Sequence, residues 1–188
     1  SGTVWLDAQR TSPYKFYQFW LGSDDRDVLR LLKFFTFLTA EEIADLEQKL
    51  TAAPEKREAQ RALARTVTRM NHGEDALNRA EKISQIFFGG NLMELSAAEI
   101  LDVIGDAPSS TLAKDKLAAG LAATELLVGA GLATSKGDAR RAIESGGIYL
   151  NGARVTEVAK VVQTADAIEG RLLILRKGAK NWHVVRID

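Results

Sequence analysis

Apolar residues recur at helical spacing between residues 13 and 104, which predicts an all-helical bundle. Capping and breaking residues divide this region into six helices. In chain order, the signals are Ser12-Pro13 and Gly22 for the first helix, Ser23 for the second, Thr39 with Glu42 for the third, Pro54 and Gly73 for the fourth, Glu74 to Phe88 with Gly89-Gly90 for the fifth, and Ser96 with Glu99 for the sixth.

The pattern changes after residue 104. Residues 105–110 are rich in Gly, Asp, Pro and Ser, as interdomain turns are, so we predict a linker over 105–114 and a second domain over 115–188. Residues 1–12 lack helical periodicity and are predicted to be a connector. In the second domain we expect helices at 116–127 and 136–144, a hairpin turning at Asn151-Gly152, and strands at 158–163, 171–177 and 181–187. The expected fold class is therefore mainly α, followed by a small α+β domain.

Composition excludes several classes of function. The 188 residues are 46% hydrophobic, enough for a buried core, and no apolar run is long enough to cross a bilayer. The chain has no cysteine, and its two histidines, His72 and His183, lie far apart without ligand spacing. We therefore expect no disulfide, no metal site, no catalytic site and no membrane partner. This composition is compatible with a cytoplasmic protein.

The formal net charge of zero hides a difference between the two halves of the chain. Residues 1–110 carry 13 Lys and Arg against 17 Asp and Glu, whereas residues 111–188 carry 12 against 8. A basic C-terminal half indicates a polyanionic partner, although a difference this small does not decide the question by itself.

One predicted helix in this basic half has a pattern suited to binding phosphates. Lys136, Arg140 and Arg141 share one side of residues 136–144, while Ala139 and Ile143 face the other way and can be buried. Further basic residues follow in the same domain, and no acidic residue occurs between Arg171 and Arg186. These candidate contacts are Lys160, Arg176, Lys177 and Lys180.

This pattern resembles the αL RNA-binding motif of small-subunit ribosomal proteins, pseudouridine synthases and the tail of bacterial tyrosyl-tRNA synthetases. The match covers about Lys116 to Val155 and includes the Ser135-Lys136 pair and the Asn151-Gly152 turn. Asp138 departs from a purely basic helix face. The resemblance implies binding of structured RNA without reading of its sequence.

The N-terminal half carries a more specific resemblance. The segments 4–7 and 11–20, the latter rich in Tyr, Phe and Trp, resemble the start of the helical anticodon-binding domain of bacterial tyrosyl-tRNA synthetases. Segments 30–38 and 68–74 continue the likeness, so the two resemblances together cover nearly the whole chain in family order.

This resemblance implies a C-terminal fragment of a tyrosine–tRNA ligase whose partner is tyrosine tRNA. The nucleotide-binding sheet, with its ATP and Mg²⁺, would belong to a preceding part of the parent protein, as would the contacts of a homodimer. By position in the family pattern, Asp25 matches the carboxylate that contacts the first anticodon base. An acidic residue in the first turn of a helix is also stabilising for purely structural reasons.

Two other interpretations remain open at this stage. The chain could be a free-standing αL-type protein acting on ribosomal RNA, although the aromatic N-terminal motif argues against this. Alternatively, residues 13–104 could form a protein-interaction bundle with an incidental basic tail. A pseudouridine synthase would need a catalytic aspartate in a large sheet domain, for which the chain has no room.

Overall fold

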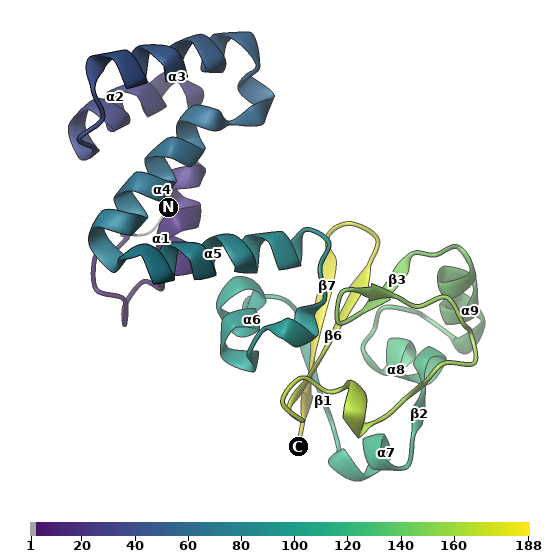
Figure 1. The fold of residues 1–188 in the computed structure, drawn as a ribbon. Coiled ribbons are helices and arrows are strands. Elements are labelled where there is room, and N and C mark those ends of the chain that lie inside the picture. The colour runs from purple at the N-terminus through teal and green to yellow at the C-terminus, as the bar shows by residue number, and fades with distance from the viewer. Residues whose placement is uncertain (1–2) are drawn as a thin grey trace. The chain divides into compact units, whose positions relative to one another are not determined.

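In the computed structural model, which describes residues 3–188, helices come first and a mixed sheet follows (Figure 1). The chain divides between Ser84 and Gln85 into two units, called here the helical unit and the C-terminal unit. The expectation of a mainly α region followed by a small α+β region is confirmed. Within residues 3–188, no helix has the length and apolar character needed to cross a membrane.

The helical unit is built around α4. Its elements are α1 (Pro13–Leu21), α2 (Asp25–Phe35), α3 (Ala40–Ala52), the 3₁₀ turn η1 (Pro54–Lys56), α4 (Glu58–His72) and most of α5 (Glu74–Phe87). Helix α4 packs against α1, α2 and α3, and its apolar stripe of Ala59, Leu63 and Val67 is buried against Phe16 of α1 and Leu32 of α2. This burial explains the aliphatic stripe of α4 and the position of Phe16, whereas Phe19, Phe34, Phe35 and Phe37 are exposed.

Two of the predicted helix starts in this unit are wrong. Asp24, rather than Ser23, caps α2, because the Asp24 side chain accepts a hydrogen bond from the Arg26 backbone N–H. Pro54 begins the turn η1 and not α4. Arg57 then adopts a left-handed conformation with φ of 51°, so the long helix starts only at Glu58.

The C-terminal unit contains a five-stranded sheet with the order β1-β7-β6-β3-β4. Strand β1 runs parallel to β7, and the other neighbours are antiparallel. In chain order, the elements of the C-terminal unit after the end of α5 are η2 (Leu92–Glu94), α6 (Ala97–Ile104), β1 (Ser109–Leu112), α7 (Lys114–Ala118), β2 (Leu121–Ala122), α8 (Ala123–Gly129), α9 (Lys136–Glu144), β3 (Ile148–Leu150), β4 (Ala153–Arg154), β5 (Val161–Val162), η3 (Thr164–Asp166), β6 (Leu172–Lys177) and β7 (Asn181–Ile187).

Helices cover both faces of this sheet, with α8 and α9 on one side and α6 on the other (Figure 1). On the first side, Leu173 and Leu175 of β6 are buried in one core with Leu127 of α8 and Ile143 of α9. This alternation of side chains along β6 is what orients α9 relative to the strands.

The division between the units lies twenty residues before the domain boundary expected from the turn composition. Residues 85–104 belong to the C-terminal unit, where Leu92 and Ile100 are buried and the Leu92 backbone N–H donates to the Asn151 carbonyl over 3.0 Å. The segment 105–114, expected to be a linker, contains β1 and is paired with β7. Its Gly and Pro residues therefore mark a turn inside a unit.

Residues 116–127 do not form the single helix that their apolar pattern predicts. Gly120 has φ of 86° and separates α7 from α8, and the two residues that follow it form β2, which pairs with β5. Strand β5 is also shorter than the predicted strand at 158–163.

Candidate nucleic-acid interface

Helix α9 has the two-sided character that its sequence predicts. Ala139 and Ile143 are buried, whereas the side chains of Lys136, Arg140 and Arg141 are 68%, 65% and 73% exposed. All three cations therefore lie on the outside of one helix, beside a buried apolar side that fixes its position. Such a surface can contact phosphates without any movement of the backbone.

Each of these three cations is paired with a carboxylate of the same unit. Lys136 contacts Glu125 of α8, Arg140 Nε lies 3.0 Å from Glu144 Oε1, and Arg141 Nη2 lies 3.8 Å from Asp138 Oδ1. Exposed ion pairs contribute about 0–1 kcal/mol, so an RNA phosphate can replace the carboxylate at little cost.

Asp138, the acidic residue on this basic face, holds the helix start in place. Its Oδ2 accepts a hydrogen bond from the Thr134 backbone N–H over 3.1 Å, and this bond, together with the charges of Lys177 and Arg141, lowers the pKa of its carboxyl. Its own backbone N–H donates to the Oγ of Ser135, the helix cap. Asp138 therefore stabilises the start of α9.

Strand β6 and the turn after it carry three of the predicted contacts, but on different sides. Lys177 Nζ donates to the Leu132 carbonyl over 2.8 Å and lies 4.0 Å from Asp138, which places it beside the start of α9. Arg176, its neighbour, lies on the other face of the strand over the ring of Tyr149. Lys180 is exposed in the turn to β7.

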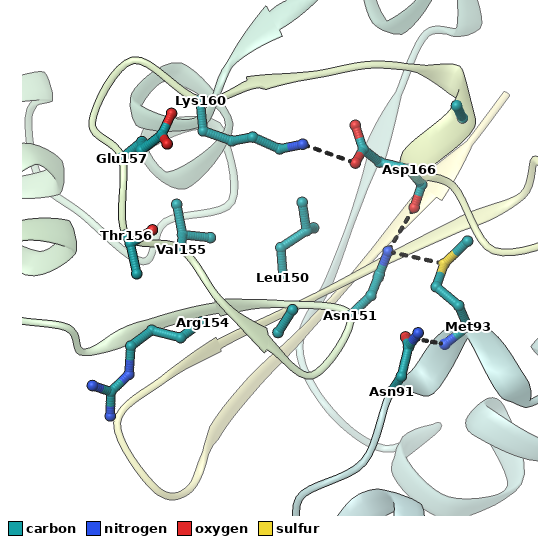
Figure 2. Close-up of a pocket in the computed structure, with 12 residues that line it drawn as sticks. Asn91, Met93, Leu150, Asn151, Arg154, Val155, Thr156, Glu157, Lys160 and Asp166 are labelled. Atoms are coloured by element: carbon teal, nitrogen blue, oxygen red, sulfur yellow. Dashed lines mark hydrogen bonds and ion pairs between the residues drawn. The ribbon is translucent and has the colours of Figure 1, made fainter.

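Lys160 is held at a separate place, a pocket of 450 Å³ next to the hairpin of β3 and β4 (Figure 2). Its Nζ lies 3.0 Å from Asp166 Oδ1, and Figure 2 shows the two side chains pointing toward each other across the pocket. Leu150 and Val155 line the apolar part of this pocket. The structure therefore brings Lys177 to α9, while Lys160 is engaged elsewhere.

Sequence reasoning missed two residues of this region, Tyr149 and Arg154. They face each other across the hairpin, and Arg154 Nη2 donates to the Tyr149 hydroxyl over 3.1 Å. Their pairing could have been predicted from the sequence, because the Asn151-Gly152 turn fixes which residues of β3 and β4 lie opposite each other.

Asp25 is the first residue of α2, and it is exposed at the surface of the helical unit. One of its carboxylate oxygens, Oδ1, accepts a hydrogen bond of 2.6 Å from the buried amide of Gln60 on α4. The neighbouring acids have other partners, since Asp24 pairs with Arg26 and Asp27 with Arg30. Of the three acidic residues in this turn, Asp25 is therefore the one whose carboxylate is oriented by a buried side chain of α4.

Family models match both halves of the chain. Residues 1–89 match the model for class I tRNA synthetases of the tryptophan and tyrosine type, and residues 99–185 match the model for the C-terminal domain of SYY-like tyrosine–tRNA ligases. The chain belongs to the tyrosine–tRNA ligase family. The chain is similar to the C-terminal region of bacterial-type tyrosyl-tRNA synthetases. The alternative of a free-standing αL-type protein is not favoured.

Individual tyrosine–tRNA ligases are similar to this chain over its whole length. It is 51% identical to the enzyme of Roseiflexus castenholzii over 100% of the chain and 44% of the relative. The corresponding values are 49%, 100% and 44% for Opitutus terrae, and 48%, 99% and 43% for Geobacillus kaustophilus. The chain thus spans less than half the length of these relatives. A solved tyrosyl-tRNA synthetase C-terminal domain is 34% identical, covering 53% of this chain and 97% of that domain, with a TM-score of 0.43.

Proposed function

We propose that this chain is the tRNA-binding C-terminal part of a tyrosine–tRNA ligase. The observation that carries the proposal is the similarity to tyrosine–tRNA ligases over at least 99% of the chain, at 51% identity for Roseiflexus castenholzii and 48% for Geobacillus kaustophilus. The exposed basic side of α9, mounted on a buried apolar side, supports the same conclusion.

In this proposal the two units have different tasks. The C-terminal unit holds the tRNA backbone, because positive charge contacts phosphates whatever the sequence. Its proposed contacts are Lys136, Arg140, Arg141, Lys160, Arg176, Lys177 and Lys180. The helical unit recognises the anticodon through Asp25, since a carboxylate accepts from the ring N–H and the amino group on guanine's Watson–Crick edge. Gln60 fixes the orientation of that carboxylate.

We further propose that the complete protein is a homodimeric ligase that uses ATP and Mg²⁺. The residues named above enter this proposal as tRNA contacts.

Titration of the chain with tyrosine tRNA and with one unrelated tRNA, at two salt concentrations, tests this function. We expect tighter binding of tyrosine tRNA at both concentrations, with affinity for both RNAs falling as salt rises because phosphate contacts release counterions. Binding of neither RNA would refute the proposal. Equal binding of both RNAs would support contacts to the tRNA backbone and would contradict recognition of the anticodon by this chain.

A further inference from the structure

A row of alternating aromatic and arginine side chains crosses the sheet of the C-terminal unit. Tyr149 of β3 lies between Arg154 of β4 and Arg176 of β6, with which it is paired in register, and Arg176 is in turn paired with Trp182 of β7. Adjacent strands lie about 4.8 Å apart, so the Cα atoms of the two arginines are about 10 Å apart. Both side chains are long enough to meet above Tyr149.

The Tyr149 ring brings the two guanidinium groups together. The Arg176 Cζ lies 3.9 Å from the ring centroid and the Arg154 Cζ lies 5.6 Å from it. Arg176 also lies 5.2 Å from the centroid of the Trp182 ring. Cation–π contacts of this kind orient a guanidinium without neutralising its charge.

Neither arginine is paired with an acid among residues 3–188. This distinguishes them from the α9 cations, each of which has a carboxylate partner. The Arg176 Nε is buried without a hydrogen-bond acceptor in this part of the chain. Two like charges held on one ring repel each other, and an anion bound between them would relieve that repulsion.

The two arginines lower the pKa of the Tyr149 hydroxyl. The hydrogen bond from Arg154 is the main cause that lowers the pKa of the Tyr149 hydroxyl, and the charges of both arginines add to it. The hydroxyl remains an acceptor that holds Arg154 in place, which leaves the other N–H groups of that guanidinium available for a ligand.

We propose that Arg154 and Arg176 together grip one backbone phosphate of the bound RNA, with Tyr149 as the positioning residue between them. This inference rests on the proposed function, and it adds a binding site that includes Arg154 and Tyr149. Arginine suits this role because its planar fork can donate two hydrogen bonds to one phosphate.

Arg176 lies on the sheet face opposite α8 and α9, because it alternates along β6 with Leu175, which is buried in the core with those helices. Arg154 lies beside Gly146, where an added Cβ atom would come within 3.3 Å of Arg154 Nη1. Gly146 lies two residues beyond Glu144, the last residue of α9, so the Arg154 side chain is close to the C-terminal end of the basic helix.

The test is the salt dependence of tyrosine tRNA binding to the 188-residue chain with Arg154→Ala, Arg176→Ala and both changes. Each single change should weaken binding about tenfold at low salt, since a charge-assisted contact is lost. Each should also reduce the slope of log Kd against log salt by about 0.7 to 0.9. Because the two side chains hold the same phosphate, the double variant should lose no more slope than either single variant.

Matched controls are Arg171→Ala and Arg186→Ala, which remove exposed arginines from the opposite end of β6 and β7 and should leave the slope unchanged. Tyr149→Phe keeps the ring but loses the hydroxyl that holds Arg154, and should weaken binding less than Arg154→Ala. Thermal unfolding identifies any variant that is misfolded. If Arg176→Ala is destabilised, the result for Arg154→Ala decides the test, because Arg154 is exposed.

An unchanged slope in Arg154→Ala would overturn the inference, as would a slope loss in the double variant equal to the sum of the two single losses. Either result would leave the proposed function intact if the unsubstituted chain still prefers tyrosine tRNA. Failure of the unsubstituted chain to bind any tRNA would instead refute the proposed function, and this inference with it.

Discussion

At the scale of single residues, Asn151 fixes the hairpin of β3 and β4 that follows α9. Asn151 is 5% exposed and adopts φ of 49°, which asparagine tolerates better than most residues. Its side-chain amide donates to the Asp166 carbonyl over 2.5 Å (Figure 2). Its Oδ1 accepts from the Ile174 backbone N–H over 2.9 Å. One side chain thus ties the turn to η3 and to β6.

Asn151→Ala should lower the free energy of unfolding by about 2–4 kcal/mol, because one buried and one partly buried backbone group lose their partner and alanine disfavours a positive φ. Urea unfolding of the 188-residue chain measures the effect. Asn181→Ala, at an exposed position of β7, is the control and should change stability by less than about 0.5 kcal/mol. Equal stability of the two variants would contradict this account of the hairpin.

The hairpin also shows how far the sequence alone could lead at this scale. The Asn151-Gly152 pair was sufficient to predict the turn, because few other dipeptides adopt two successive positive φ values. The partners of Asn151 could not be predicted, since Asp166 and Ile174 are distant in sequence. For the same reason, the contact between Asp25 and Gln60 was not predictable.

At the scale of elements, the start of α2 depends on an ionised cap. Arg26 donates side-chain and backbone hydrogen bonds to Asp24 and holds the pKa of its carboxyl at about 2, below the ordinary 3.8. A carboxyl with a depressed pKa stabilises the folded state above its unfolded pKa. That stabilisation is lost as pH falls from about 4 to about 2.

Asp24→Asn should therefore remove part of the acid dependence of stability, because asparagine can cap the helix but has no carboxyl to protonate. Unfolding midpoints measured between about pH 4 and pH 2 should fall less steeply in this variant than in the unsubstituted chain. In Arg26→Ala, the pKa of Asp24 followed by NMR should rise toward its ordinary value. An unchanged pH profile in both variants would contradict the assigned cap.

Caps were the most predictable feature at this scale, and breaks in longer apolar patterns were the least. The boxes of Thr39 with Glu42 and of Ser96 with Glu99 are present as expected, because they involve neighbouring residues only. Residues 116–127 were misassigned because β2 forms by pairing with Val161 and Val162, a long-range contact that local periodicity does not contain.

At the scale of the whole molecule, the chain consists of two units with unlike surfaces. Segment 85–104 completes the C-terminal unit by covering the sheet face opposite α8 and α9, where the tilted rings of Phe87 and Trp182 have centroids 5.8 Å apart. The turn composition of 105–110 gave no indication of this, since it is the same for a turn within a domain and for a linker.

A fragment of residues 85–188 should consequently unfold in one cooperative transition. A fragment of residues 105–188 should be much less stable, because it lacks buried Leu92, Leu95 and Ile100. Urea unfolding followed by Trp182 fluorescence compares the two. Equal stability of the fragments would show that segment 85–104 is not part of the folded unit.

The proposed division of roles, in which the helical unit recognises the anticodon and the C-terminal unit binds the tRNA backbone, can be tested by a double-mutant cycle on Asp25. Affinities of the unsubstituted chain and of Asp25→Asn would be measured for tyrosine tRNA with guanine or adenine as the first anticodon base. We predict that changing the base weakens binding to the unsubstituted chain by about 1–3 kcal/mol and has little effect on the variant. Equal sensitivity of both proteins to the base would contradict the role of Asp25 and remove anticodon reading from this residue.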